Sequence, residues 1–169
     1  MYFSTWTEFV EWFTAGYKHC VLEEGATECG PFLAPTADPG MPPWKAEWFV
    51  IFCDGNYIRA TENYYAKARA QGGGGYRQHF SFHYGPTPPF SANGIPEWRL
   101  EKTYHLRIDC DRRGPHLHYK GEDHIPQSRI VGMKIIDQGI FDFVCKIQEQ
   151  RKAKVSVEDS LGFRVETAA

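Results

Sequence analysis

The chain has 169 residues, of which 42% are hydrophobic and 24% charged, and its formal net charge is -2. These values are typical of a globular protein, and we expect one domain over residues 1–169. Because the charge is nearly balanced, there is no global attraction for nucleic acid or an anionic membrane, and any affinity for phosphate must be local. No stretch approaches the ~20 apolar residues that cross a bilayer, and no signal peptide is evident, which indicates a cytoplasmic protein.

The five cysteines are scattered along the chain and include no Cys-x-x-Cys pair. This spacing argues against a zinc finger or a thioredoxin-like motif. We therefore expect reduced, mostly buried thiols. The cysteines are Cys20, Cys29, Cys53, Cys110 and Cys145.

Two amphipathic helices are predicted, one near each end of the chain. Over residues 5–22 apolar side chains recur at helical spacing, and Thr5 followed by Glu8 is typical of a capping box. Over residues 139–152 an apolar stripe is followed by basic residues that suit a helix C-terminus, and Asp137 is the expected N-cap.

The segment after the first helix alternates irregular and strand-like stretches. Proline and glycine are frequent in residues 26–46, which predicts a loop that acts as a lid or wraps the domain. The apolar run 47–53 is typical of a central strand, and the turn signal at 54–56 leads to a partner strand over 57–69, with a helix as the alternative. The glycine run 72–75 is expected to connect a hairpin, with a phosphate-cradling loop as the alternative.

Three further segments carry most of the side chains that are competent for catalysis. We predict strands over 76–84, 98–111 and 115–120, with an irregular loop over 85–97 and a tight turn at 112–114. Since side chains alternate between the two faces of a strand, the polar residues of each segment share one face. The polar side chains on that predicted face are Arg77, His79, Ser81, His83, His105, Arg107, Asp109, Asp111, His116, His118 and Lys120.

The remaining segments complete a prediction of the fold class. Residues 121–126 are expected to form a turn, 129–136 a short last strand, and 154–169 an extension or tail. The order of helix, strands and helix predicts an α+β fold. We expect a mostly antiparallel sheet of five or six strands, with the N-terminal and C-terminal helices packed on one face.

His116 and His118 lie two residues apart on one strand face, where two imidazoles can converge on one metal ion. A third ligand would come from a neighbouring strand. The candidates for it are His79, His83, His105 and Asp109. Three protein ligands and a water are typical of catalytic zinc, so we expect a divalent ion, zinc or manganese.

The same face also allows chemistry without a metal. Two histidines can divide the roles of general base and general acid near neutral pH. Arginine and lysine side chains beside them would neutralise a phosphate. Strand alternation directs the aromatic rings of Tyr84 and Tyr104 to the core side. The candidate catalytic residues are His105, Arg107, His116, His118 and Lys120, with Arg77 as a further phosphate-binding side chain.

Two known signatures are only partly present. The stretch 116–119, His-Leu-His-Tyr, begins like the histidine-triad signature, but Lys120 stands where the third histidine belongs. The stretch 79–81, His-Phe-Ser, gives one copy of the two-histidine phosphoesterase repeat, and no second copy follows. We therefore assign no family. His124 is interpreted as a loop histidine bonded to backbone, with a metal ligand as the alternative.

These patterns lead to two hypotheses about function. The first is a nuclease-type hydrolase of a phosphodiester, RNA or a nucleotide, in which His118→Ala abolishes turnover without unfolding because His118 faces solvent. The second is a non-enzymatic binding module, such as an inhibitor or an immunity protein of a bacterial conflict system. The aromatic content of 15% and the Pro-rich loops suit a protein partner. A third possibility is a metal sensor or store, which would share the His site and show no turnover. The interpretation without function is a solvated polar sheet face.

Overall fold

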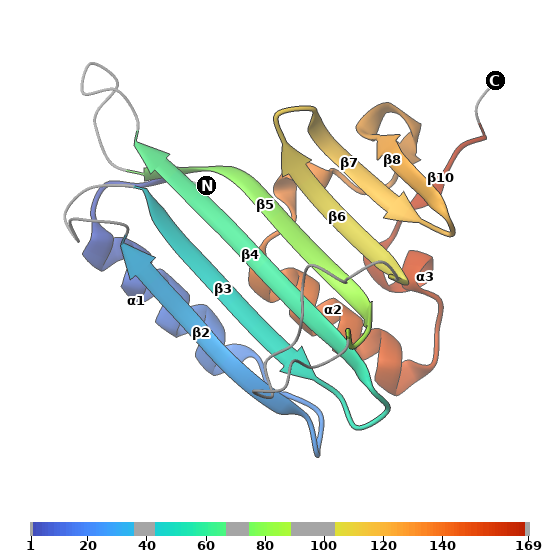
Figure 1. The fold of residues 1–169 in the computed structure, drawn as a ribbon, viewed down its shortest axis with the longest axis horizontal. Coiled ribbons are helices and arrows are strands. Elements are labelled where there is room, and N and C mark those ends of the chain that lie inside the picture. Colours follow the sequence, from blue (N-terminus) through green and yellow to red (C-terminus); the bar gives the residue numbers. More distant parts are fainter. Residues whose placement is uncertain (1, 36–42, 67–74, 89–103, 168–169) are drawn as a thin grey trace.

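The computed structural model describes residues 2–35, 43–66, 75–88 and 104–167, which form an antiparallel sheet and three α-helices (Figure 1). The helices are α1 (Trp6–His19), α2 (Ile140–Ala153) and α3 (Val157–Leu161). The sheet runs in the order β2 (Thr27–Pro35), β3 (Trp44–Ile51), β4 (Asn56–Ala66), β5 (Gly75–Pro86), β6 (Leu106–Asp111), β7 (Gly114–Tyr119) and β8 (Glu122–Pro126), and β1 (Tyr2–Phe3) pairs with β5. A separate antiparallel pair consists of β9 (Ile130–Val131) and β10 (Arg164–Val165).

Tight turns fix the neighbours of the later strands. Asp111 pairs with Gly114, so β6 and β7 are joined by two residues. Lys120 and Gly121, which join β7 to β8, both have positive φ, of 51° and 80°. Positive φ at both positions is the requirement of the two-residue turn that matches the twist of a hairpin. Strands β6, β7 and β8 therefore lie next to one another.

One face of the sheet carries the core. Phe9 of α1 stacks on Trp44 of β3 with ring centroids 5.7 Å apart, and Phe143 of α2 stacks on Phe82 of β5 at 5.3 Å. Figure 1 shows both long helices behind the sheet. From His79 onward in β5, and in β6 and β7, the polar side chains alternate with the buried apolar ones and therefore lie on the opposite face.

The predicted α+β class and the mostly antiparallel sheet are confirmed, although the described residues supply eight strands to the sheet where five or six were expected. The first helix begins as predicted, because the side chain of Thr5 accepts a hydrogen bond from the amide of Glu8. Asp137 as the N-cap of α2 is wrong. Gly139 holds that position without a side-chain bond, and the carboxylate of Glu62 accepts from the first helical amide, that of Ile140.

Several predicted irregular segments are regular in the structure. The loop over 26–46 is wrong for residues 27–35, which form the edge strand β2, and for residues 44–46, which begin β3. Proline has no backbone N–H to donate to a neighbouring strand. It is tolerated in β2 because β2 lies at the edge of the sheet and its register shifts between Cys29 and Phe32. The turn over 121–126 is wrong, since β8 pairs with β7, and the tail over 154–169 contains α3 and β10. The last strand over 129–136 shrinks to β9.

The partner strand predicted over 57–69 is confirmed as β4, which runs to Ala66. Residues 36–42 of the predicted first loop lie outside the described residues. So do residues 72–74 of the glycine run and residues 89–97 of the second loop. The predicted strand over 98–111 is described from residue 104, and β6 begins at Leu106.

The expectation of reduced thiols is wrong for one pair of cysteines. Cys20, at the end of α1, forms a disulfide with Cys145 of α2, and their Cα atoms lie 6.2 Å apart. Cys53 is free and exposed, and Cys110 is free and buried. Among the described helices, none combines the length and the apolar character that a membrane span requires.

Candidate metal centre

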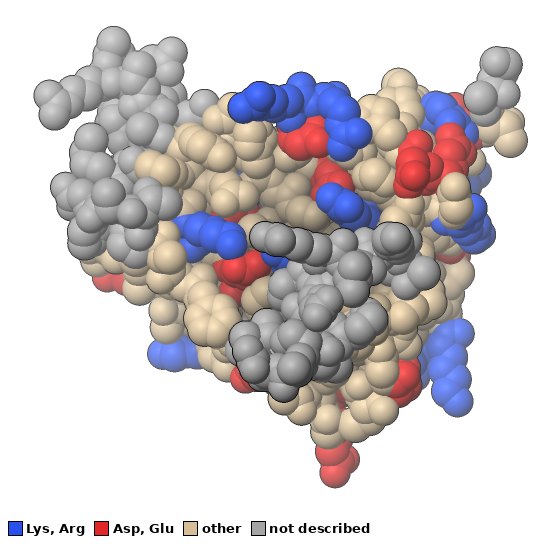
Figure 2. Space-filling view, in the orientation of Figure 1, with Lys and Arg blue, Asp and Glu red and all other residues tan. Residues whose placement is uncertain are grey.

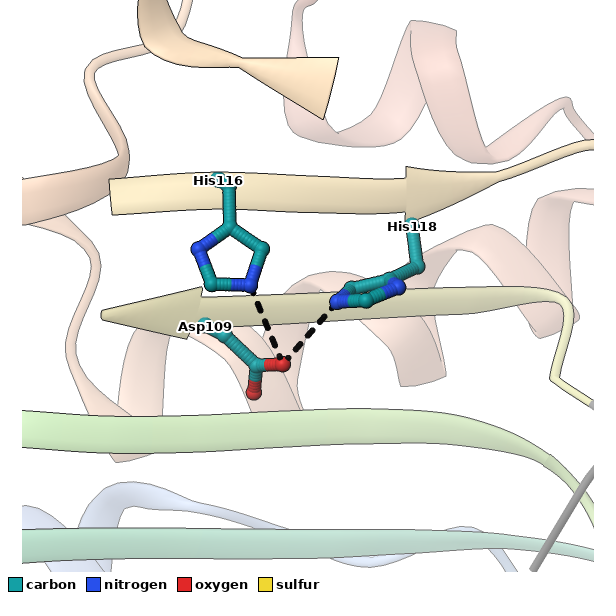
Figure 3. Close-up of side chains that lie close together, drawn as sticks. All are labelled: Asp109, His116 and His118. Carbon is teal, nitrogen blue, oxygen red and sulfur yellow. Dashed lines mark ion pairs between the residues drawn. The ribbon is translucent and has the colours of Figure 1, made fainter. Parts of the chain in front are cut away.

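The β6–β7 hairpin brings one carboxylate and two imidazoles together. Asp109 of β6 is the direct cross-strand partner of His116 of β7, and Arg107 is the partner of His118. All four side chains lie on the sheet face opposite the helices. Figure 3 shows the two imidazoles and the Asp109 carboxylate pointing toward one another from the two strands.

The three side chains converge at one point. Oδ2 of Asp109 lies 3.2 Å from Nε2 of His118 and 3.7 Å from Nε2 of His116. One ligand atom from each residue lies within 4.8 Å of the others, so the group can hold a metal ion. The side chains are 3%, 1% and 11% exposed for Asp109, His116 and His118. The expectation that His118 faces solvent is therefore wrong.

The outer nitrogen of each imidazole has an acceptor. Nδ1 of His116 donates to the carbonyl of Gly114 at 2.9 Å, and Nδ1 of His118 donates to Oδ1 of Asp123 at 3.1 Å. For His116, the carbonyl assigns the proton to Nδ1 in the neutral ring, so the lone pair of Nε2 faces Asp109 and Arg113. Both nitrogens of His118 face a carboxylate, Nδ1 that of Asp123 and Nε2 that of Asp109. A carbonyl or carboxylate on the outer nitrogen is the usual surrounding of a metal-binding histidine.

Two guanidinium groups border this centre. Nε of Arg107 lies 2.8 Å from Oδ2 of Asp109, and Nη2 of Arg113 donates to Nε2 of His116 at 3.3 Å. Arg113 also pairs with the carboxylate of Asp111. Both arginine side chains are partly exposed, at 39% and 57%, so they link the buried centre to the surface.

The surroundings shift the pKa of each of the three side chains for a different reason. Burial opposes ionisation of Asp109, but His118, Arg107 and Ser81 outweigh it and lower the pKa of Asp109. The carboxylate of Asp109 raises the pKa of His118, whereas burial lowers the pKa of His116. An ionised carboxylate thus faces one imidazole that favours the charged form and one that favours the neutral form.

Two predicted ligands lie on the same face but outside the group of three. His83, the cross-strand partner of Arg107, stacks on Tyr57 with ring centroids 5.0 Å apart. His79 lies farther along β5, where its ring packs against Tyr65 at 5.4 Å. Among the described residues, the structure therefore selects Asp109 as the third partner of the two histidines of β7.

Three residues predicted for this face lie elsewhere. A register shift between β4 and β5 turns Arg77 to the helix side, where it pairs with Glu62 at 2.7 Å. Lys120 lies in the turn after β7, and its Nζ reaches Glu158 of α3 at 2.6 Å. His105 precedes β6, so strand alternation does not apply to it. It is exposed and donates to the side chain of Asn56.

Three residues that contact the centre were not predicted from the sequence. Tyr104 was expected on the core side, but it precedes β6 and its ring lies 5.7 Å from that of His118. Asp123 was assigned to a turn, and Arg113 was read only as a turn residue. His124, interpreted as a loop histidine, lies instead in strand β8, and its ring packs 4.2 Å from that of His116. The signal for Arg113 and Asp123 was their closeness in sequence to the His-x-His pair.

The surroundings of the centre carry both signs of charge. On the face turned to the viewer, the described part in Figure 2 has Lys and Arg beside Asp and Glu. A pocket of about 640 Å³ lies at Tyr119 and Lys120 and is not lined by the group of three. Two of its cations are paired, Lys120 with Glu158 and Arg129 with Glu122, and Arg164 also lines it. Arg107 and Arg113 lie beside the centre and are likewise paired, with Asp109 and Asp111.

Comparison with protein-family models, with curated proteins and with solved structures found no match. The function is accordingly argued from the chemistry of the site.

Proposed function

We propose that this protein is a small metal-dependent hydrolase of phosphodiesters, with zinc or manganese held by Asp109, His116 and His118. The observation that carries the proposal is the convergence of three ligand atoms within 4.8 Å in a buried group. Two histidines and one carboxylate, with further positions open, are typical of catalytic metal sites. When bound, the ion would act as a Lewis acid and lower the pKa of its water to near ~7.

The outer hydrogen bonds support a cation at the centre. With Nδ1 protonated, the neutral rings of His116 and His118 direct two lone pairs at an ionised carboxylate. Three electron-rich atoms that face one another in a buried place repel unless a cation lies between them. Without an ion, a second proton on His118 and the guanidinium groups of Arg107 and Arg113 provide part of this positive charge.

The two arginines support a phosphate substrate, with RNA or a nucleotide as the class. A guanidinium binds two phosphate oxygens at once and is the usual partner for such groups. Arg107 and Arg113 are partly exposed and lie within 3.3 Å of ligand atoms. If these two guanidinium groups moved from Asp109 and His116 to a phosphate, both ligands would be free to bind the metal. The guanidinium groups would also neutralise charge on the substrate.

The test is metal content together with turnover. Tag-free protein would be dialysed against zinc or manganese, measured by mass spectrometry, and assayed with bis(p-nitrophenyl) phosphate and a short RNA. Asp109→Asn keeps the size of the side chain but removes its charge. We expect this variant to abolish turnover. It should also weaken metal binding by more than the ~10–100-fold that is lost when a residue that only hydrogen-bonds a metal ligand is removed.

The matched control is His105→Gln, which removes an exposed imidazole outside the group. It should keep both metal content and turnover. Turnover without metal that is lost in His116→Gln would contradict the metal and favour acid–base catalysis by histidine. Protein with neither metal nor turnover would contradict the hydrolase and favour a binding module.

A further inference from the structure

The edge of the sheet beside the candidate metal centre has an irregular register. Strands β7 and β8 pair at Leu117 and again at Tyr119, but two residues of β8, Asp123 and His124, stand opposite His118 alone. This arrangement is a β-bulge, which bends the strand and changes the direction of the side chains beside it.

The bulge contains strained backbone. His124 has a φ of 59°, which lies in the left-handed region that residues with a side chain rarely adopt. Such strain persists only where surrounding contacts hold it, and it concentrates at functional sites. Here the ring of His124 packs 4.2 Å from that of His116, so the strained residue touches the centre itself.

The bulge brings Asp123 to the outer nitrogen of His118. Oδ1 of Asp123 lies 3.1 Å from Nδ1 of His118 and also accepts a hydrogen bond from the hydroxyl of Tyr104. Burial and this carboxylate raise the pKa of Tyr104 to about 12, so the hydroxyl is a donor at neutral pH. The Asp123 side chain is 77% exposed and that of His118 is 11% exposed, so the bulge brings an exposed carboxylate to a buried imidazole.

We infer that Asp123 is a positioning residue, which, anchored by Tyr104, keeps the proton of His118 on Nδ1 and its Nε2 directed at Asp109. A neutral histidine can carry its proton on either nitrogen, and only the form with a bare Nε2 can bind a metal ion at the centre. The inference rests on the proposed function for its effect on metal binding, whereas the tautomer is a property of the metal-free protein.

The tautomer is measured directly by long-range ¹H–¹⁵N NMR of metal-free protein, at a pH where the ring of His118 is neutral. We expect the proton on Nδ1 in the wild type and on Nε2, facing Asp109, in Asp123→Ala. Asp123→Asn retains an oxygen that accepts from Nδ1 and should restore the wild-type tautomer. The same tautomer in the wild type and in Asp123→Ala would overturn the inference.

Zinc titration provides the second readout. We expect Asp123→Ala to weaken zinc binding ~10–100-fold, and Tyr104→Phe to weaken it less. The matched control is Glu122→Ala, which removes the neighbouring exposed carboxylate of β8, paired with Arg129. Equal affinity in Asp123→Ala and the wild type would also overturn the inference. Wild-type protein that binds neither zinc nor manganese would instead refute the proposed function, and the NMR result alone would then decide the role of Asp123.

Discussion

At the scale of single residues, the buried pair of Arg77 and Glu62 anchors a helix to the sheet. The two side chains lie 2.7 Å apart and are 4% and 0% exposed. Arg77 also donates to the carbonyls of Gln138 and Ile136, and Glu62 accepts from the amide of Ile140. The pair therefore satisfies polar groups on both sides of the start of α2.

Arg77→Met should lower the free energy of unfolding by about 3–5 kcal/mol, because it leaves the charge of Glu62 buried without a partner. Urea denaturation measures this loss. Arg59→Met is the matched control, since Arg59 pairs with Glu47 on the other face of the sheet, where both side chains are partly exposed. The control should cost at most about 1 kcal/mol. Equal losses in the two variants would contradict the role of burial.

At the scale of elements, the end of α2 has an unfavourable cap. The helix closes at Lys154 in the left-handed conformation, with a φ of 54° and a ψ of 34°. Glycine is the residue that usually occupies this place, because it has no Cβ to clash. The next helix, α3, begins soon after with Ser156 as its N-cap.

Lys154→Gly should therefore raise the free energy of unfolding by about 0.5–1 kcal/mol. The opposite sign is expected for Lys152→Gly, inside the last turn of α2, which should cost about 1 kcal/mol. Thermal and urea denaturation of both variants measure the two effects. A destabilised Lys154→Gly variant would show that the lysine side chain contributes more than the strain of its backbone.

At the scale of the whole molecule, two long-range links hold the helix layer together. The disulfide between Cys20 and Cys145 spans 125 residues of sequence. Arg151 of α2 pairs with Glu23, after α1, and with Asp54, in the turn between β3 and β4. These links connect segments that no local pattern relates.

Removal of the disulfide should destabilise the protein by about 2–4 kcal/mol, since a closed loop of this length restricts the unfolded chain. The double variant Cys20→Ala/Cys145→Ala and reduction of the wild type should give similar losses, and reductant should then have no effect on the double variant. Cys53→Ser, at the exposed free cysteine, is the control and should keep the wild-type response to reductant. A wild type insensitive to reductant would contradict the prediction.

The link through Asp54 predicts a dependence of stability on acid. Burial opposes ionisation of Asp54, but Arg151 and Asn56 outweigh it and lower its pKa to about 2. Since this value lies below that of the unfolded chain, about 3.9, the stabilisation is present above pH ~4 and is lost as the pH falls toward ~2. Asp54→Asn should thus differ from the wild type near pH ~6 and converge with it near pH ~2.

Urea denaturation at several pH values measures this convergence. In an Arg151→Ala background, Asp54→Asn should lose most of its pH-dependent effect, because the main partner of the carboxylate is gone. A difference between Asp54→Asn and the wild type that does not change with pH would contradict the assigned cause.

Local periodicity was sufficient for much of the fold and for the three candidate metal ligands of the centre. The alternation of polar and apolar residues placed Arg107, Asp109, His116 and His118 on one face, and the structure keeps them there. Helical spacing likewise located α1 and α2. These predictions succeed because the period of a strand or helix is set by the backbone of the segment itself.

The tertiary structure alone decided which side chains reach the site, because this depends on how distant segments pair with one another. The shift in β5 removed Arg77 from the site face, and the bulge in β8 added Asp123. The turn at Lys120 directed its ammonium group to α3. A bulge or a turn reverses the face of every later side chain, and its position is set by the partner strand and by contacts distant in sequence. The sequence by itself therefore determined which residues alternate, and the tertiary structure decided which of them meet.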